Sequence, residues 1–117
     1  MKLVTVSQTC GRVPVTVFQL GDRLNMGNSE EFEQATKGAY AAGARYMVLD
    51  LSKVPSLTSA GIRTILGIHK MLAETKDEIK HLKLVGPMPG VREVLDIAGL
   101  LKIIEIYNNV EEAVASF

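Results

Sequence analysis

The sequence predicts one α/β domain over residues 1–117, with the element order ββαβαβαβα and a mostly parallel sheet that carries an antiparallel strand at its N-terminal edge. Two observations predict this fold class. Short apolar runs alternate with longer segments of helical periodicity, which is typical of parallel strands joined by helices. The first two runs, however, follow one another with only a short turn between them, which favours a hairpin. A chain of 117 residues is an ordinary length for one domain.

The hairpin is expected over residues 3–9 and 13–20. The first run alternates apolar and polar residues as an edge strand does, and Gly11 and Arg12 form the turn. The second run is rich in β-branched residues, and Pro14 stands near its start, where a missing N–H group is tolerated.

The first helix follows a loop over residues 21–25. Asn28 is a candidate N-cap, and Glu31, three residues later, completes the pattern of a capping box. Gly43 is expected to end the helix. The face expected to pack inward consists of Phe32, Ala35, Ala39 and Ala42.

The next strand and helix occupy the middle of the chain. Residues 46–51 form a nearly continuous apolar run, which indicates a strand covered on both faces. Ser59 opens the second helix. Its apolar side is expected to comprise Ile62, Ile65, Leu66, His69, Leu72 and Ala73, whereas Lys70, Glu74 and Asp77 are expected to face solvent.

The last elements follow the same alternation. Residues 81–85 predict a third strand of the core type, with His81 facing solvent at its start. Residues 91–98 predict a short helix that stops at Gly99, and residues 103–107 predict a last strand. Asn108 or Asn109 is expected to cap a final helix.

Composition argues against several classes of function. Thirteen basic and thirteen acidic residues balance, whereas nucleic-acid binders usually carry a basic excess. Cys10 is the single cysteine and is expected to be a passive residue at a strand end. Residues 1–6 lack the long apolar core of a signal peptide, and no run suits a membrane span, so a cytoplasmic protein is expected.

Enzymatic motifs are sparse. The chain has neither a GxGxxG fingerprint nor a GxxxxGK[ST] phosphate loop, and its two histidines, His69 and His81, do not form a metal pattern, so no cofactor or metal is expected. Asp50 ends a parallel-type strand, where a phospho-accepting aspartate of a receiver domain would lie. That interpretation also needs an acidic pair and a later lysine. Only Asp22 is present, and Gly86 stands where the lysine is expected.

Residues 50–62, which read D-L-S-K-V-P-S-L-T-S-A-G-I, carry the specific signal. They align without a gap to the signature D-L-S-x-V-x-F-[IM]-D-S-[ST]-G-[LI]. The chain therefore resembles the STAS family, the domains of bacterial anti-sigma factor antagonists and of sulfate-transporter tails. Residues 21–25, 84–100 and 107–113 also resemble blocks of that family.

The resemblance implies that Ser59 is a phosphoacceptor for a partner kinase that is itself the anti-sigma factor. The chain departs from the signature at several positions. Thr58 replaces the aspartate and becomes a second candidate acceptor, Ala60 replaces a hydroxyl residue, Ser56 replaces an aromatic residue, and Asn25 stands where an aspartate is frequent.

A hydroxyl where a loop enters a helix can also be judged by physics alone. Ser59 is expected to act as an exposed N-cap, where a phosphate gains from the helix dipole but disrupts a docked complex. Gly61 either leaves room for a partner's backbone or packs tightly within the fold, and Lys53 and Arg63 are placed to meet acidic groups. The expected partner-binding set is Asn25, Ser56, Thr58, Ser59, Gly61, Ile62 and Arg63.

Three hypotheses follow. The first is an anti-sigma factor antagonist, a non-enzymatic switch that binds an anti-sigma factor kinase and thereby frees a sigma factor. The second is a STAS scaffold subunit of a signalling or transport assembly, in which Ser59 only caps a helix. The third is an enzyme or small-ligand carrier of flavodoxin-like shape. A weak homodimer is compatible with each of them.

Overall fold

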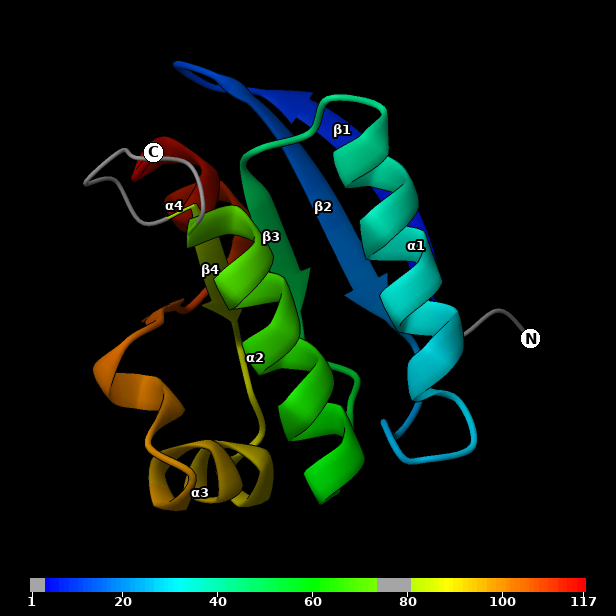
Figure 1. Cartoon of the computed structure of the whole chain (residues 1–117). Helices are drawn as coiled ribbons and strands as arrows, with labels where there is room; N and C mark the ends of the chain where they lie inside the picture. Colours follow the sequence, from blue (N-terminus) through cyan, green and yellow to red (C-terminus); the bar gives the residue numbers. More distant parts are fainter. Residues whose placement is uncertain (1–3, 74–80) are drawn as a thin grey trace.

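A computed structural model describes residues 4–73 and 81–117 of the chain and confirms the predicted order of elements (Figure 1). The short 3₁₀ helix η1 is an addition that the sequence analysis did not predict. In chain order the elements are β1 (Val4–Cys10), β2 (Pro14–Leu20), α1 (Ser29–Ala41), β3 (Met47–Asp50), α2 (Ser59–Ala73), β4 (Leu82–Val85), α3 (Pro89–Ile97), η1 (Leu100–Lys102), β5 (Glu105–Tyr107) and α4 (Val110–Ala115). Glu74 and Asp77 lie outside the described residues.

The five strands form one mixed sheet in the order β1-β2-β3-β4-β5. β1 pairs with β2 antiparallel, and every other neighbouring pair is parallel, as predicted. Helices α1 and α2 cover one face of the sheet, and α4 packs on the opposite face (Figure 1). Each parallel strand therefore ends at the same edge of the sheet, and the loops that follow β2 and β3 lie there together.

Two apolar cores lie on the two faces. Successive residues of β3 alternate between them: Met47 and Leu49 belong to the core under α1 and α2, whereas Val48 belongs to the core under α4. The nearly continuous apolar run of β3 is thus buried on both sides, as expected for a central parallel strand. This two-sided burial fixes the strands whose ends carry the candidate site.

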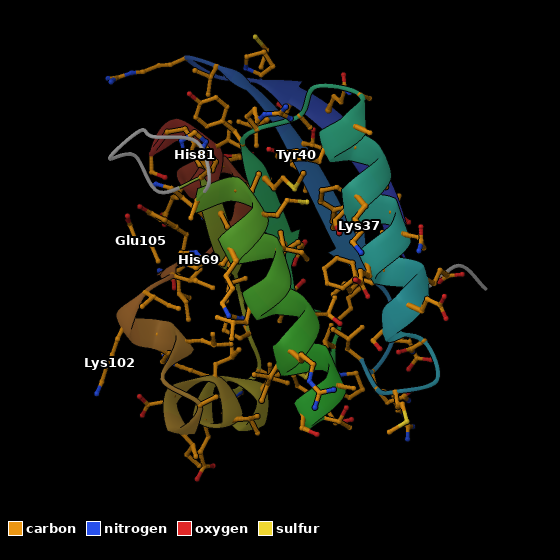
Figure 2. The ribbon with its side chains drawn as sticks, in the orientation of Figure 1. Lys37, Tyr40, His69, His81, Lys102 and Glu105 are labelled. Carbon is orange, nitrogen blue, oxygen red and sulfur yellow. The ribbon has the colours of Figure 1, made fainter. Side chains whose placement is uncertain are left out.

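The structure corrects the expected environment of His81. The residue is buried instead of facing solvent, with 6% of its surface exposed. Its carbonyl accepts a hydrogen bond from the N–H group of Met47, so its backbone already belongs to the sheet. Figure 2 labels the residue. Its Nδ1 lies 2.9 Å from the Arg45 carbonyl oxygen, and its ring stacks on Tyr46 at 4.7 Å between centroids.

Helix faces and caps also differ in detail from the expectations. Asn28 is the N-cap of α1, but its side chain bonds the Arg23 and Asn25 backbone and makes no capping bond. In α2 the buried residues are Gly61, Ile65, Ile68 and Leu72. Ile68 was not among the residues predicted for the apolar side, and Ala73, which was, is exposed at the end of the helix. His69 is half-buried and has an interaction partner, as expected of a boundary residue. At α4 the predicted cap is confirmed: the Asn109 side chain accepts a bond from the Glu112 N–H group.

Candidate functional site

The candidate site begins where the loops after β2 and β3 are joined side by side. Leu24 and Leu57 form a parallel bridge. The Leu24 N–H group donates to the Ser56 carbonyl at 3.2 Å, and the Thr58 N–H group donates to the Leu24 carbonyl at 3.1 Å. Because the bridge is parallel, the residues that follow Leu24 and those that follow Leu57 leave it in the same direction.

Gly61 locks the two loops against the start of α2. It is buried, and a Cβ atom placed on it would lie 2.6 Å from Leu57 Cδ1 and 3.0 Å from both Leu24 Cγ and Leu24 Cδ2. Real Cβ atoms do not come within 2.6 Å of another atom, so a side chain at this position would require Leu57 and Leu24 to shift. Packing within the chain therefore favours glycine here. Of the two alternatives for Gly61, this geometry supports tight packing within the fold, because the side chains of Leu57 and Leu24 occupy the space beside it.

Ser59 is the first residue of α2, and its side chain is exposed. The Thr58 carbonyl accepts the first helical hydrogen bond, from the Ile62 N–H group at 3.0 Å. Thr58 consequently holds the position before the helix, and the expectation that Ser59 itself is the N-cap is wrong by one residue. The backbone N–H groups of the first helical turn have no helical acceptors, and they give this end of the helix a positive electrostatic potential. The exposed Ser59 side chain lies within that potential.

The two hydroxyl groups next to each other differ in their surroundings. The Thr58 hydroxyl donates a hydrogen bond to the Leu24 carbonyl oxygen at 3.3 Å, whereas no bond to the Ser59 side chain is found within the described part of the chain. Modifying Thr58 would break a contact that links the two loops. Modifying Ser59 would break none of the described contacts.

The remaining members of the predicted set surround this serine. Ser56 and Arg63 are exposed, Ile62 is half-buried against the core, and Asn25 is half-buried in the neighbouring loop. The Leu24–Leu57 bridge brings Asn25 beside Thr58, because each follows a bridged residue. Six of the seven predicted residues therefore have surface at this edge of the sheet, and Gly61 lies beneath them.

Met26 belongs to this surface and was missed by the sequence analysis. It is 84% exposed, in a turn held by hydrogen bonds from the Asn25 N–H group to Asn28 Oδ1 at 2.9 Å and from the Ser29 N–H group to the Asn25 carbonyl at 2.9 Å. A single methionine among polar residues has no periodic pattern, so nothing in the sequence indicates its exposure. A protruding apolar side chain on a hydrogen-bonded turn suits contact with another protein.

The charges near Ser59 are mixed. Lys53 and Arg63 are exposed in the loop before α2 and on its second turn, and Arg23 lies 3.9 Å from the carboxylate of Asp22. Asn25 and Thr58 provide amide and hydroxyl groups where the family signature has carboxylates. The site thus has cationic side chains and no carboxylate directly beside the serine in sequence.

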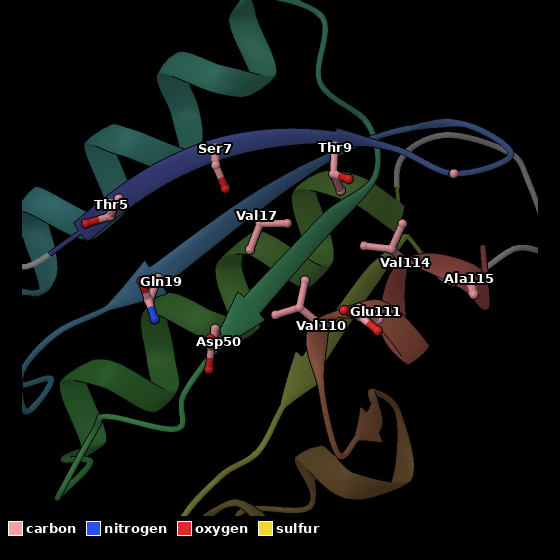
Figure 3. Close-up of a pocket in the computed structure, with 11 residues that line it drawn as sticks. Thr5, Ser7, Thr9, Val17, Gln19, Asp50, Val110, Glu111, Val114 and Ala115 are labelled. Atoms are coloured by element: carbon pink, nitrogen blue, oxygen red, sulfur yellow. The ribbon is translucent and has the colours of Figure 1, made fainter.

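Of the hollows in the surface, one of about 450 Å³ between α1 and α2 is lined by Arg63 but by no other member of the predicted partner-binding set. Another, of about 490 Å³, lies on the face that carries α4, between β1 and that helix, and none of the predicted partner-binding residues lines it (Figure 3). Among the described residues, no three histidine, cysteine, aspartate or glutamate side chains group in a way that could bind a metal ion. None of the described helices has the length and apolar character needed to cross a bilayer.

Comparison with known proteins gives a consistent result. A profile of the STAS domain matches residues 6–113. A Bordetella bronchiseptica protein named as an anti-sigma factor antagonist, BtrV, is 35% identical over 94 residues, which are 80% of this chain and 78% of that protein. A structure from Thermotoga maritima, described as an anti-sigma factor antagonist, has a TM-score of 0.80 at 26% identity over 87% of this chain and 86% of its own. The phosphorylated form of Bacillus SpoIIAA shares the fold, with a TM-score of 0.73 at 18% identity over 97% of each chain.

Proposed function

Because the chain belongs to the STAS domain family, whose anti-sigma factor antagonists are non-enzymatic regulators, we propose that it is a protein-binding switch of this kind. In its unmodified form it binds an anti-sigma factor and thereby frees a sigma factor. Phosphorylation of Ser59 by that same partner, acting as a kinase, releases the complex. Since a sigma factor acts on RNA polymerase, the proposal places the protein in the cytoplasm.

The observation that carries this proposal is the exposed Ser59 at the first position of α2, in register with the serine of the family signature. A phosphate there adds roughly −1.5 to −2 charges at neutral pH. The positive end of the helix stabilises that charge by about 0.3–1 kcal/mol at an exposed site. The modified domain is therefore expected to keep its fold.

A docked complex responds differently to the same charge. Met26 and Ile62 provide apolar surface near Ser59, and a partner that covers them also removes water from the serine. A phosphate buried there without a counter-charge costs the complex about 2–5 kcal/mol. Because phosphate on Ser59 destabilises the complex and not the fold, phosphorylation is expected to release the partner from a domain that stays folded.

Ser59 is a better acceptor than Thr58 on structural grounds. The Thr58 hydroxyl donates a hydrogen bond to the Leu24 carbonyl oxygen, and the Thr58 carbonyl accepts the first hydrogen bond of the helix. A kinase that modifies Thr58 has to displace the contact between the two loops. That the related fold of Bacillus SpoIIAA exists in a phosphorylated form is consistent with a modification that leaves this architecture intact.

The test is to incubate the protein with its cognate anti-sigma factor and ATP and to locate phosphate by mass spectrometry. Phosphate is expected on Ser59, to be lost in Ser59→Ala and retained in the matched control Thr58→Val. Installing phosphoserine at position 59 by genetic encoding should weaken the complex by at least about 30-fold, the equivalent of ~2 kcal/mol. Absence of phosphate from both residues, together with unchanged affinity, would refute the switch.

A STAS scaffold subunit without phosphorylation is the second candidate. It is favoured by one observation, the replacement of two expected carboxylates by Asn25 and Thr58. In that case the protein binds its partner through the same surface, and phosphoserine at position 59 is an artificial change. Partner binding without phosphate transfer in the experiment above selects this function over the first.

A further inference from the structure

The two edges of the sheet differ in how they are protected against pairing with another strand. β5 has three residues, among them Glu105, and it contacts η1. β1 has seven residues, Val4–Cys10, with no charged side chain and no proline. All seven pair with consecutive residues of β2 without a bulge. Short strands, charges, prolines and bulges are the usual devices that block an exposed edge, and β1 has none of them.

The open edge is also accessible from both faces. The side chains of residues 5–10 are exposed, and Val6 keeps 49% of its surface in solvent. On the face that carries α4, the hydroxyl groups of Thr5, Ser7 and Thr9 border the hollow of about 490 Å³, because that helix does not reach β1 (Figure 3). On the opposite face α1 lies over β1 and contacts it (Figure 1), but Val6 and Gln8 border a second hollow there. The outer backbone edge of β1 has no paired strand within the sheet.

We propose that β1 pairs antiparallel with β1 of a second copy of this chain, about a two-fold axis at Ser7, so that two five-stranded sheets become one. This register overlaps all seven residues. Ser7 then opposes itself, and Thr5 opposes Thr9 of the second copy, which forms a row of facing hydroxyl groups. On the other face Val6 opposes Gln8 of the second copy. No like charges meet within the strand, so the edge is complementary to itself.

A second copy fits this edge better than an unrelated strand for two reasons. It supplies a strand of the same length and the same uncharged, hydroxyl-rich sequence, and the two-fold arrangement uses both free β1 edges at once, so that assembly stops at the dimer. One strand pair is a small interface, below about 1,200 Å² in total, so the dimer is expected to be weak and dependent on concentration.

The arrangement leaves the Ser59 surface of each copy uncovered. Ser7 pairs with Val17 in the middle of β2, whereas Ser59 follows the loops at the end of the sheet where β2 and β3 terminate. On that face α1 lies over β1, and α2 packs beside α1 on the side away from β1 (Figure 1). The dimer therefore presents two copies of that surface to a partner, which raises the apparent affinity for any partner with two sites.

Sedimentation equilibrium of the purified chain tests the proposal without a partner. The mean mass is expected to rise from 12.7 kDa toward twice that value between ~10 μM and ~1 mM protein. Ser7→Lys places two ammonium groups at the two-fold axis and should weaken the dimer at least about tenfold. The control Gln34→Lys, an exposed change on α1, should leave association unchanged. A mean mass that stays at that of one chain, or a dimer that Ser7→Lys does not weaken, overturns the proposal.

Disulfide trapping provides a second measurement that tolerates a weak dimer. Cys10 is free and exposed, so Cys10→Ser removes the native thiol. In that background Ser7→Cys should form a linked dimer rapidly under mild oxidation, since facing residues of antiparallel strands lie within disulfide reach. The neighbouring Gln8→Cys should do so slowly, because its diagonal separation from itself is about 7–8 Å. Equal rates for the two variants contradict the predicted register.

Discussion

Replacing Gly61 by alanine tests whether this glycine packs the site from beneath or contacts a partner. The added methyl group would meet Leu57 Cδ1 at 2.6 Å and two atoms of Leu24 at 3.0 Å, and both leucines are buried. Overpacking of a core usually costs about 1–3 kcal/mol. Alanine in a helix recovers up to about 1 kcal/mol relative to glycine. The net expectation is a loss of up to ~2 kcal/mol in the free energy of unfolding.

Gly67→Ala is the matched control within the same helix. Gly67 is exposed, and a Cβ atom there would meet nothing within 4 Å, so this change should stabilise the fold by about 0.5–1 kcal/mol. Urea unfolding of the two variants should therefore differ by about 1–3 kcal/mol, the overpacking cost alone. If Gly61→Ala stabilises as much as Gly67→Ala, the packing argument is refuted. If it instead abolishes partner binding without a loss of stability, Gly61 has a role at the interface.

Three further changes test how the framework is held. Asn109→Ala removes the side-chain acceptor for the Glu112 N–H group and should cost ~1 kcal/mol in urea unfolding, while the exposed neighbour Asn108→Ala should cost less than half as much. Gly99→Ala should cost about 1 kcal/mol by the same measurement although its Cβ atom would meet nothing within 4 Å, because its φ of +80° disfavours any side chain. Phe32→Ala should cost about 3–5 kcal/mol and lower the thermal midpoint by more than 10 °C or so, since the ring is fully buried; a near-neutral result would show that α1 does not anchor the core.

The order of the elements could be predicted because each one satisfies a local pattern. The run at β3 is apolar at every core position, and the segment at α2 repeats apolar residues with helical spacing. The hairpin follows from two strand-like runs separated by a short turn. η1 was not predicted, since Leu100–Lys102 is too short for any periodicity to appear.

Errors arose where the surroundings of a residue come from distant parts of the chain. His81 was expected in solvent because it begins a strand, but Arg45 and Tyr46, in the segment just before β3, provide its hydrogen bond and its stacking partner. Asn28 has the sequence of a capping residue, yet its side chain bonds the backbone of the preceding loop, which competes with capping.

For the candidate site, the sequence alone indicated the serine, its position at the start of a helix and the family in which such a serine belongs, because these depend on a short contiguous segment. Only the tertiary structure decided which side chains share the surface of Ser59, since the parallel bridge between Leu24 and Leu57 joins loops that are far apart in the chain. The same bridge turns Gly61 inward and brings the turn that carries Met26 to this surface. Exposure is a property of packing between segments, so no local pattern contains it.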